Sequence, residues 1–136
     1  MNNRIIKFRA WDNAFGTMES DVQNSQMFYH MIDSPERFTL MQFTGLHDKH
    51  GKEIYEGDIM RILQRDWPSQ SDYSIPVKDY MISISCLCVV TFEDGAFIPK
   101  HHSGEGSWFN EDFFPRQRDI FEVIGSIHST PELLNL

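Results

Sequence analysis

The sequence of 136 residues is long enough to bury a hydrophobic core without a metal ion or a disulfide, and it predicts one domain. Its 20 acidic and 12 basic residues give a net charge of −8, and the acidic residues are scattered, which disfavours non-specific binding to nucleic acid or anionic membranes. The N-terminus lacks the apolar stretch of a signal peptide, and no apolar run reaches the roughly 20 residues that span a membrane, so we expect a cytoplasmic protein.

The N-terminal segment predicts a β-hairpin. Residues 5–11 alternate between apolar and basic side chains, as in a half-buried strand with a basic outer edge, the two sets being Ile6, Phe8 and Ala10 against Lys7 and Arg9. Residues 12–16 contain turn formers at both ends, and residues 17–21 can return as a second strand. Residues 22–38 give no clear pattern, whereas residues 40–44 return to strand character.

Two turns separate apolar segments in the middle of the chain. In residues 48–51, Asp48 can bond its own backbone, and Gly51 supplies the positive φ that closes a short loop. The second turn contains Gly57 and Asp58 and leads into residues 59–63, a branched apolar run that suits a strand. A turn of this form before an apolar strand is typical of small SH3-like barrels, and we expect a positive φ at Gly57 as well.

The longest strand pattern covers residues 80–92 and contains Cys86 and Cys88. Side chains two positions apart on one strand face lie about 6.6 Å apart, which is too far for a disulfide. We therefore expect two buried thiols that react slowly in the folded protein. Half of a zinc site is the alternative, but Cys-x-Cys lacks the usual spacing and the chain has no second cysteine pair.

A second hairpin is predicted where Asp94-Gly95 separates two apolar runs, since this pair favours a tight primed turn. Residues 96–98 can pair back, and Pro99 is expected to stop that strand. The polar stretches 64–79 and 100–107 indicate exposed loops on either side of these strands.

The C-terminal part predicts a final strand over residues 120–127, with Gly125 at a bulge or at a close backbone approach. Thr130 is expected to cap one short helical turn in which Pro131 takes the first position.

Three motifs carry a resemblance to a known family. They are IKFRAWD at residues 6–12, QFTGL at 42–46 followed by GKEIYEGDI at 51–59, and EVIGSI at 122–127 followed by PELL at 131–134. Their order and spacing resemble the YopX family of phage and prophage proteins. The resemblance implies a β-rich, SH3-type barrel domain encoded by a phage or prophage of a bacterium, and it implies no known activity and no catalytic residues.

Together these patterns predict a mainly β fold. We expect an SH3-like small barrel core over residues 39–136, preceded by an N-terminal hairpin and variable arm over residues 1–38 and closed by the short C-terminal helical turn.

Some polar residues could carry chemistry in the predicted loops. His101 and His102, with Glu105 and Asp94 nearby, could supply metal ligands for a small hydrolase. Adjacent side chains in an extended chain point to opposite sides, however, and the recognised ligand spacings are missing. A solvated loop is the better interpretation.

The two central turns also contain titratable groups. His47 and His50 flank Asp48, but these residue types are common in turns. Glu56 and Asp58 resemble a carboxylate pair, yet across a glycine turn they more simply accept backbone N–H bonds. We therefore assign no catalytic, cofactor-binding or metal-binding residue and name only structural turn residues, which are Asp48, Gly51, Gly57, Asp58, Asp94 and Gly95.

An aromatic cluster follows the second predicted loop and could form a contact surface, its members being Trp108, Phe109, Phe113 and Phe114. Core packing is the alternative for each. The leading hypothesis is a nonenzymatic protein-binding module that forms a homo-oligomer and has a phage or host protein as its partner. Nucleic-acid binding is the second hypothesis, for which the candidate basic cluster is Lys7, Arg9, Arg61 and Arg65.

Overall fold

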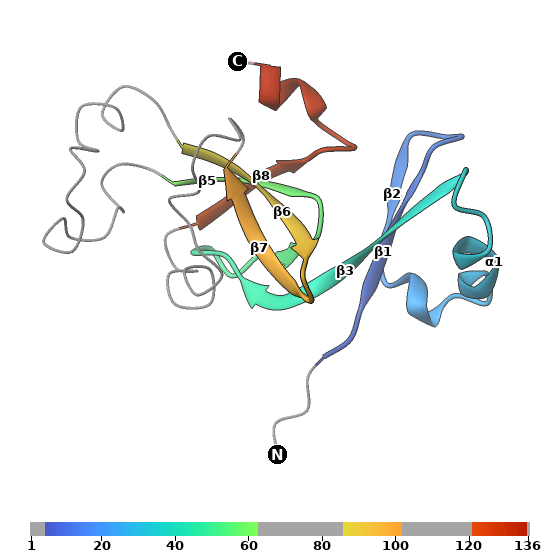
Figure 1. The fold of residues 1–136 in the computed structure, drawn as a ribbon. Coiled ribbons are helices and arrows are strands. Elements are labelled where there is room, and N and C mark those ends of the chain that lie inside the picture. The colour runs from blue at the N-terminus through green and yellow to red at the C-terminus, as the bar shows by residue number, and fades with distance from the viewer. Residues whose placement is uncertain (1–4, 63–85, 102–120, 136) are drawn as a thin grey trace, which may run out of the picture.

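The computed structural model describes residues 5–62, 86–101 and 121–135, which form a mainly β fold (Figure 1). In chain order, the elements are β1 (Phe8–Asp12), β2 (Thr17–Glu19), the 3-10 helix η1 (Val22–Asn24), α1 (Phe28–Ile32), β3 (Phe38–His47), β4 (Glu53–Tyr55), β5 (Asp58–Ile62), β6 (Cys86–Glu93), β7 (Ala96–His101), β8 (Phe121–Ser126) and the 3-10 helix η5 (Pro131–Asn135). The strands form two four-stranded sheets with the orders β2-β1-β3-β4 and β7-β6-β5-β8. Every strand pair in them is antiparallel.

The predicted N-terminal hairpin is confirmed. Strand β1 pairs with β2, placing Ala10 opposite Glu19, and its other edge pairs with β3, placing Arg9 opposite Met41. This second pairing joins the predicted arm to the predicted core. The strand starts later than expected, however, because Ile6 precedes β1 and is 55% exposed.

Residues 22–38, which gave no clear pattern, fold over the first sheet as η1 and α1. Four buried residues form the core there, namely Ala10, Val22, Met31 and Phe38, and Phe8, Phe28 and Leu40 pack around them. Figure 1 shows α1 beside β1 and β3, on the side away from the second sheet. The segment is short and irregular, so burial against the sheet, not helix propensity, stabilises it.

The second hairpin has the predicted primed turn. Asp94 and Gly95 have φ values of 52° and 80°, and positive φ at both central residues is the type I′ conformation. The prediction that Pro99 stops the strand is wrong, because β7 continues to His101. Lys100, expected in the following loop, therefore also lies in β7.

The hydrogen-bond pattern explains why Pro99 is tolerated. It lies opposite Val90, whose carbonyl accepts a hydrogen bond from Gly57 N–H at 2.8 Å and so points away from β7. Strand β6 therefore needs no donor from Pro99, and β7 is an edge strand of the described sheet.

The predicted burial is confirmed for one cysteine, while the slow reaction of the thiols stays a prediction. Cys88 is fully buried, with Sγ 3.7 Å from the Met60 carbonyl oxygen. Cys86 lies in β6, but its side chain is outside the described part of the chain.

The buried face of β6 ends before the turn. Phe92, two residues beyond buried Val90, is 52% exposed and contacts Phe97 across the hairpin.

Gly125 is predicted at a bulge or at a close backbone approach, and the structure shows both. The pairing of β5 with β8 shifts between Ile59 and Met60, which are opposite Gly125 and Val123, so the bulge lies next to Gly125. A Cβ on Gly125 would lie 2.0 Å from Thr130 Oγ1. The C-terminal turn therefore packs directly on the backbone of β8.

The predicted C-terminal helical turn is present as η5, and Thr130 immediately precedes it. The Thr130 carbonyl accepts the Leu133 N–H bond, but its hydroxyl turns back, accepting from Ser126 N–H at 3.0 Å and donating to Ser126 O at 3.2 Å. Thr130 thus ties η5 to the end of β8.

The predicted loop over residues 64–79 and most of the one over 100–107 lie outside the described residues. Among the described residues, no helix meets the length and hydrophobicity that spanning a bilayer requires.

Candidate functional site

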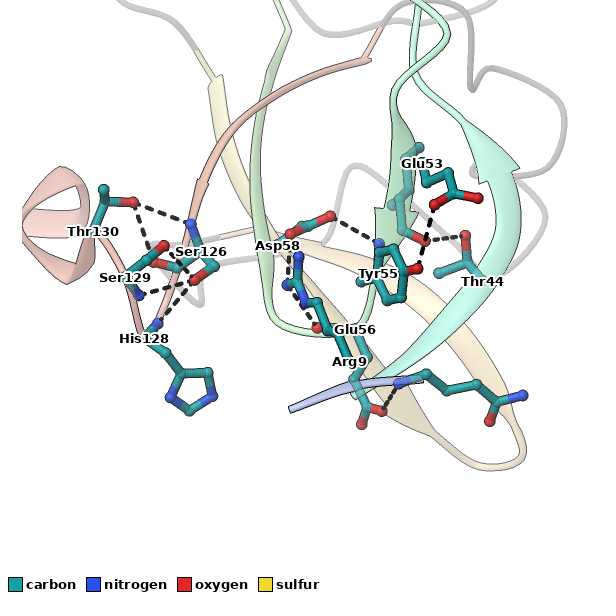
Figure 2. Close-up of polar contacts among 12 residues, drawn as sticks. Arg9, Thr44, Glu53, Tyr55, Glu56, Asp58, Ser126, His128, Ser129 and Thr130 are labelled. Atoms are coloured by element: carbon teal, nitrogen blue, oxygen red, sulfur yellow. Dashed lines mark hydrogen bonds and ion pairs between the residues drawn. The ribbon is translucent and has the colours of Figure 1, made fainter. Parts of the chain in front are cut away.

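The first, second and third sequence motifs meet at one polar cluster between the two sheets (Figure 2). We call this cluster the polar junction and define it as Arg9 and Trp11 from β1, Tyr55 from β4, Asp58 from β5, and His128 from the turn after β8. Strand pairing brings the second and third motifs together, because Asp58 lies opposite Ser126. Strand β1 then adds the first motif from the other sheet.

A buried ion pair forms the centre of the junction. Arg9 Nη2 donates to Asp58 Oδ1 at 2.7 Å and to the Glu56 carbonyl oxygen at 3.3 Å. The side chains of Arg9 and Asp58 are only 13% and 2% exposed. The expectation of a basic outer edge on β1 is therefore wrong, because this face packs against the second sheet and the turn that leads into it.

The turn before β5 is organised around the same carboxylate. Asp58 Oδ2 accepts the Tyr55 N–H at 2.8 Å, and Gly57, between the two strands, has φ +87°. Burial raises the pKa of Asp58, although Arg9 and the Tyr55 N–H oppose that shift. Asp58 therefore bonds both to the adjacent turn, through the Tyr55 N–H, and to strand β1, through Arg9.

Tyr55 covers the arginine. The Arg9 guanidinium carbon lies 4.8 Å from the centre of the Tyr55 ring, within the range of a cation–π contact. Burial and the nearby Glu53 carboxylate raise the pKa of the Tyr55 hydroxyl to about 12. Glu53 in turn forms an ion pair with Lys7, so Lys7 and Arg9 both have acidic partners.

Asp48 forms a second buried polar centre. Its Oδ1 accepts the backbone N–H groups of His50 and Lys52, which is the predicted turn, and Gly51 has φ +83°. Its Oδ2 accepts the N–H of Val123 in β8 at 2.9 Å. Burial would raise the pKa of Asp48, but the three N–H groups together lower it. This hydrogen bond links the third motif, which contains Val123, to the turn within the second motif.

The C-terminal turn is held by its own side chains. Ser126 Oγ accepts the N–H groups of His128 and Ser129, and it lies 2.8 Å from Ser129 Oγ. These bonds direct the His128 imidazole away from the serines (Figure 2), and it stacks on Trp11 with ring centres 6.0 Å apart. Ser126 and His128 are therefore not arranged as a nucleophile and its base.

The ion pairs bear on the nucleic-acid hypothesis. Lys7 pairs with Glu53, Arg9 with Asp58, and Arg61 with Glu122 at 2.8 Å. A basic side chain that already pairs with a carboxylate has less charge to offer a phosphate. Three of the four candidate residues thus have acidic partners within the chain, although the Arg61 side chain is 39% exposed, and Arg65 is outside the described residues.

The histidine hypotheses gain no geometric support. His50 lies in its turn 3.5 Å from Glu122, and His101 is the last residue of β7, while His102 and Glu105 are outside the described residues. Within residues 5–62, 86–101 and 121–135, no three His, Cys, Asp or Glu side chains gather as a metal site would require.

The predicted aromatic cluster of Trp108, Phe109, Phe113 and Phe114 lies outside the described residues, so its contact role stays a prediction. The sequence indicates Asp48 and Asp58 only as turn residues and gives no sign of their long-range partners. Nor does it indicate His128 and Trp11 as members of a site. Two sequence features could have indicated Arg9 as a site residue: it is a charged residue inside an alternating strand, and it lies in the first sequence motif.

The chain is similar to known proteins in sequence and in fold. The sequence model described as YopX protein matches residues 16–135. No curated protein matches the sequence. The crystal structure of protein EF1440 from Enterococcus faecalis is similar over 97% of this chain and 99% of that chain, with a TM-score of 0.53 and 25% identity. Because the family match extends over most of the sequence and includes two of the three motifs that build the junction, the chain belongs to the YopX family.

Proposed function

We propose that this chain is a nonenzymatic accessory protein of a phage or prophage that acts in the bacterial cytoplasm by binding proteins, first of all a second copy of itself. The observation that carries this proposal is the apolar outer surface of α1. Tyr29 and Ile32 on this helix are 78% and 53% exposed, and Met27, which precedes it, is 53% exposed. Exposed apolar groups of this kind favour a protein contact.

The opposite side of α1 already has a role. Met31 is buried in the core of the first sheet, and Phe28 packs against that core and contacts Phe8. The helix is therefore fixed on the sheet by one side and presents the other to solvent. A rigid apolar surface loses little conformational entropy when it binds.

The distribution of charge supports a second copy of this chain as the partner that binds the exposed surface of α1. The chain carries a net charge of −8, so two copies repel each other over most of their surfaces. Residues 27–32, with the sequence MFYHMI, contain no acidic residue. Two α1 surfaces can therefore meet without bringing carboxylates together.

The polar junction supports a binding role over catalysis. Its arginine and aspartate bond to each other and to backbone groups between the sheets, and this arrangement suits a fixed scaffold. The SH3-like description of residues 39–136 stays part of the proposal, since barrels of that class bind other chains through exposed side chains.

Light scattering after size exclusion tests the proposal on the full chain. At micromolar concentration we expect the mass of at least two chains of 16.0 kDa each. The double variant Tyr29→Ser, Ile32→Ser should shift toward the single-chain mass. Phe92→Ser is the matched control, because Phe92 is also about half exposed but lies on the other sheet. A mass of one chain at all concentrations would refute self-association, and an unchanged oligomer in the double variant would refute α1 as its surface.

A further inference from the structure

His128 lies at the edge of the polar junction, where the third motif meets β1. Its imidazole stacks on the Trp11 indole with an interplanar angle of 22°. The backbone around it is fixed, because Ile127 N–H donates to the Gly57 carbonyl at 2.9 Å and Ser126 Oγ accepts the His128 N–H. A change at His128 can therefore move the side chain without moving the turn.

The charge that acts on the imidazole is Arg9 of β1. Arg9 is itself paired with Asp58 of β5. The neighbouring residues of the His128 turn, Ser126 and Ser129, are uncharged. Within the described ranges no carboxylate bonds to the imidazole, so a proton on His128 gains no direct acidic partner there.

Burial lowers the pKa of His128, and the positive charge of Arg9 lowers it further. A cation–π attraction between imidazolium and indole would act in the opposite direction. The ring centres are 6.0 Å apart, at the outer limit of such contacts, so this attraction is weak here. Desolvation and repulsion therefore decide the outcome.

We infer that the stack of His128 on Trp11 is a pH-responsive contact: when His128 gains a proton, its imidazole leaves Trp11 and turns toward water. This opens one edge of the polar junction while the Arg9–Asp58 pair and the surrounding sheets stay in place. The inference does not depend on α1 or on oligomerisation.

The direction of the effect follows from proton linkage. A histidine whose folded pKa lies below the ordinary value of 6.5 stabilises the folded contact above that value. The contribution is lost as the pH falls through the folded pKa. Acidification should therefore open the contact, and return to neutral pH should restore it.

The test is an NMR titration of the full chain from about pH 8 to about pH 5, following the His128 imidazole and the Trp11 indole N–H. We expect His128 to titrate below 6.5 and the Trp11 signal to shift with the same midpoint. The Trp11 signal should lose this transition in His128→Gln and keep it in the matched control His50→Gln, whose histidine lies in the other turn.

Three results would overturn the inference: a His128 midpoint at or above 6.5, a Trp11 signal that does not follow His128, or an unchanged Trp11 transition in His128→Gln. The first two are measured in the wild-type protein, so they decide the matter even when the variant does not fold.

Discussion

Arg9 and Asp58 are 49 positions apart in the sequence, yet their side chains form an ion pair of 2.7 Å between the two sheets. Two hydrogen bonds add to it, from Arg9 to the Glu56 carbonyl and from the Tyr55 N–H to Asp58. The pair therefore joins strand β1 to the turn that starts β5. The ion pair is thus a direct contact between the two sheets.

Removing one member of this pair should destabilise the fold strongly. For Arg9→Met we expect a loss of about 3–5 kcal/mol in the free energy of unfolding, because Asp58 is left as an uncompensated buried charge. Urea denaturation measures it. The double variant Arg9→Met, Asp58→Asn should lose less than the sum of the two single variants, since it leaves neither charge alone.

Arg37→Met provides the control for that prediction. Arg37 immediately precedes β3 and pairs with Asp12, whose side chain is only 5% exposed, but the Arg37 side chain itself is 46% exposed. Water can therefore replace the guanidinium beside Asp12, so we expect a clearly smaller loss. Equal losses in Arg37→Met and Arg9→Met would show that burial does not distinguish the two pairs.

Substitution of Gly57 should be costly for two reasons that can be separated. Gly57→Ala places a Cβ 3.1 Å from Met41 Sδ, and φ +87° strains any L side chain. We expect a loss of more than about 1 kcal/mol in urea denaturation. Gly51→Ala has φ +83° and nothing within 4 Å, so it reports the backbone strain alone. A Gly57→Ala variant as stable as wild type would contradict the positive φ.

Asp48 should make stability depend on acid. Its folded pKa lies below the ordinary value of 3.8, so its contribution is complete above that value and is lost as the pH falls through the folded pKa. At neutral pH, Asp48→Asn should cost about 1–3 kcal/mol, because an amide nitrogen cannot accept the buried Val123 N–H. Urea denaturation at neutral and acidic pH should show this difference shrinking in acid, and a constant difference would refute the assignment.

The contact between β8 and the C-terminal turn predicts a steric coupling. In Gly125→Ala the new Cβ meets Thr130 Oγ1 at 2.0 Å and Leu133 Cδ1 at 2.9 Å, so we expect a lower melting temperature. Adding Thr130→Ala removes the closer clash, although it also removes the hydroxyl bonds to Ser126. The double variant should therefore recover only part of the loss, and a purely additive result would contradict the contact.

Local patterns predicted the turns well because their causes are local. The positive φ of Gly51, Gly57 and Gly95 follows from residue types within three or four positions, and the β-bulge next to Gly125 is signalled by a glycine inside an apolar strand. The alternation around β1 likewise predicted a hairpin, although the residue at which the strand begins was wrong.

Residues 22–38 and Pro99 show where local patterns fail. The first segment has no periodicity of its own and becomes helical by packing Val22 and Met31 on the sheet. Pro99 is acceptable within a strand because the opposite Val90 carbonyl bonds to Gly57. Both outcomes depend on neighbours that the sequence does not place.

The sequence by itself determined the mainly β class, the turns and the family, since these depend on spacing along the chain. Only the tertiary structure decided that Arg9 meets Asp58, that Asp48 reaches Val123 and that His128 stacks on Trp11. The physical reason is that a charged or aromatic side chain in a strand satisfies its sequence pattern whether it faces water or a partner. Its partner is fixed by sheet packing and strand register, which depend on contacts between residues far apart in the chain.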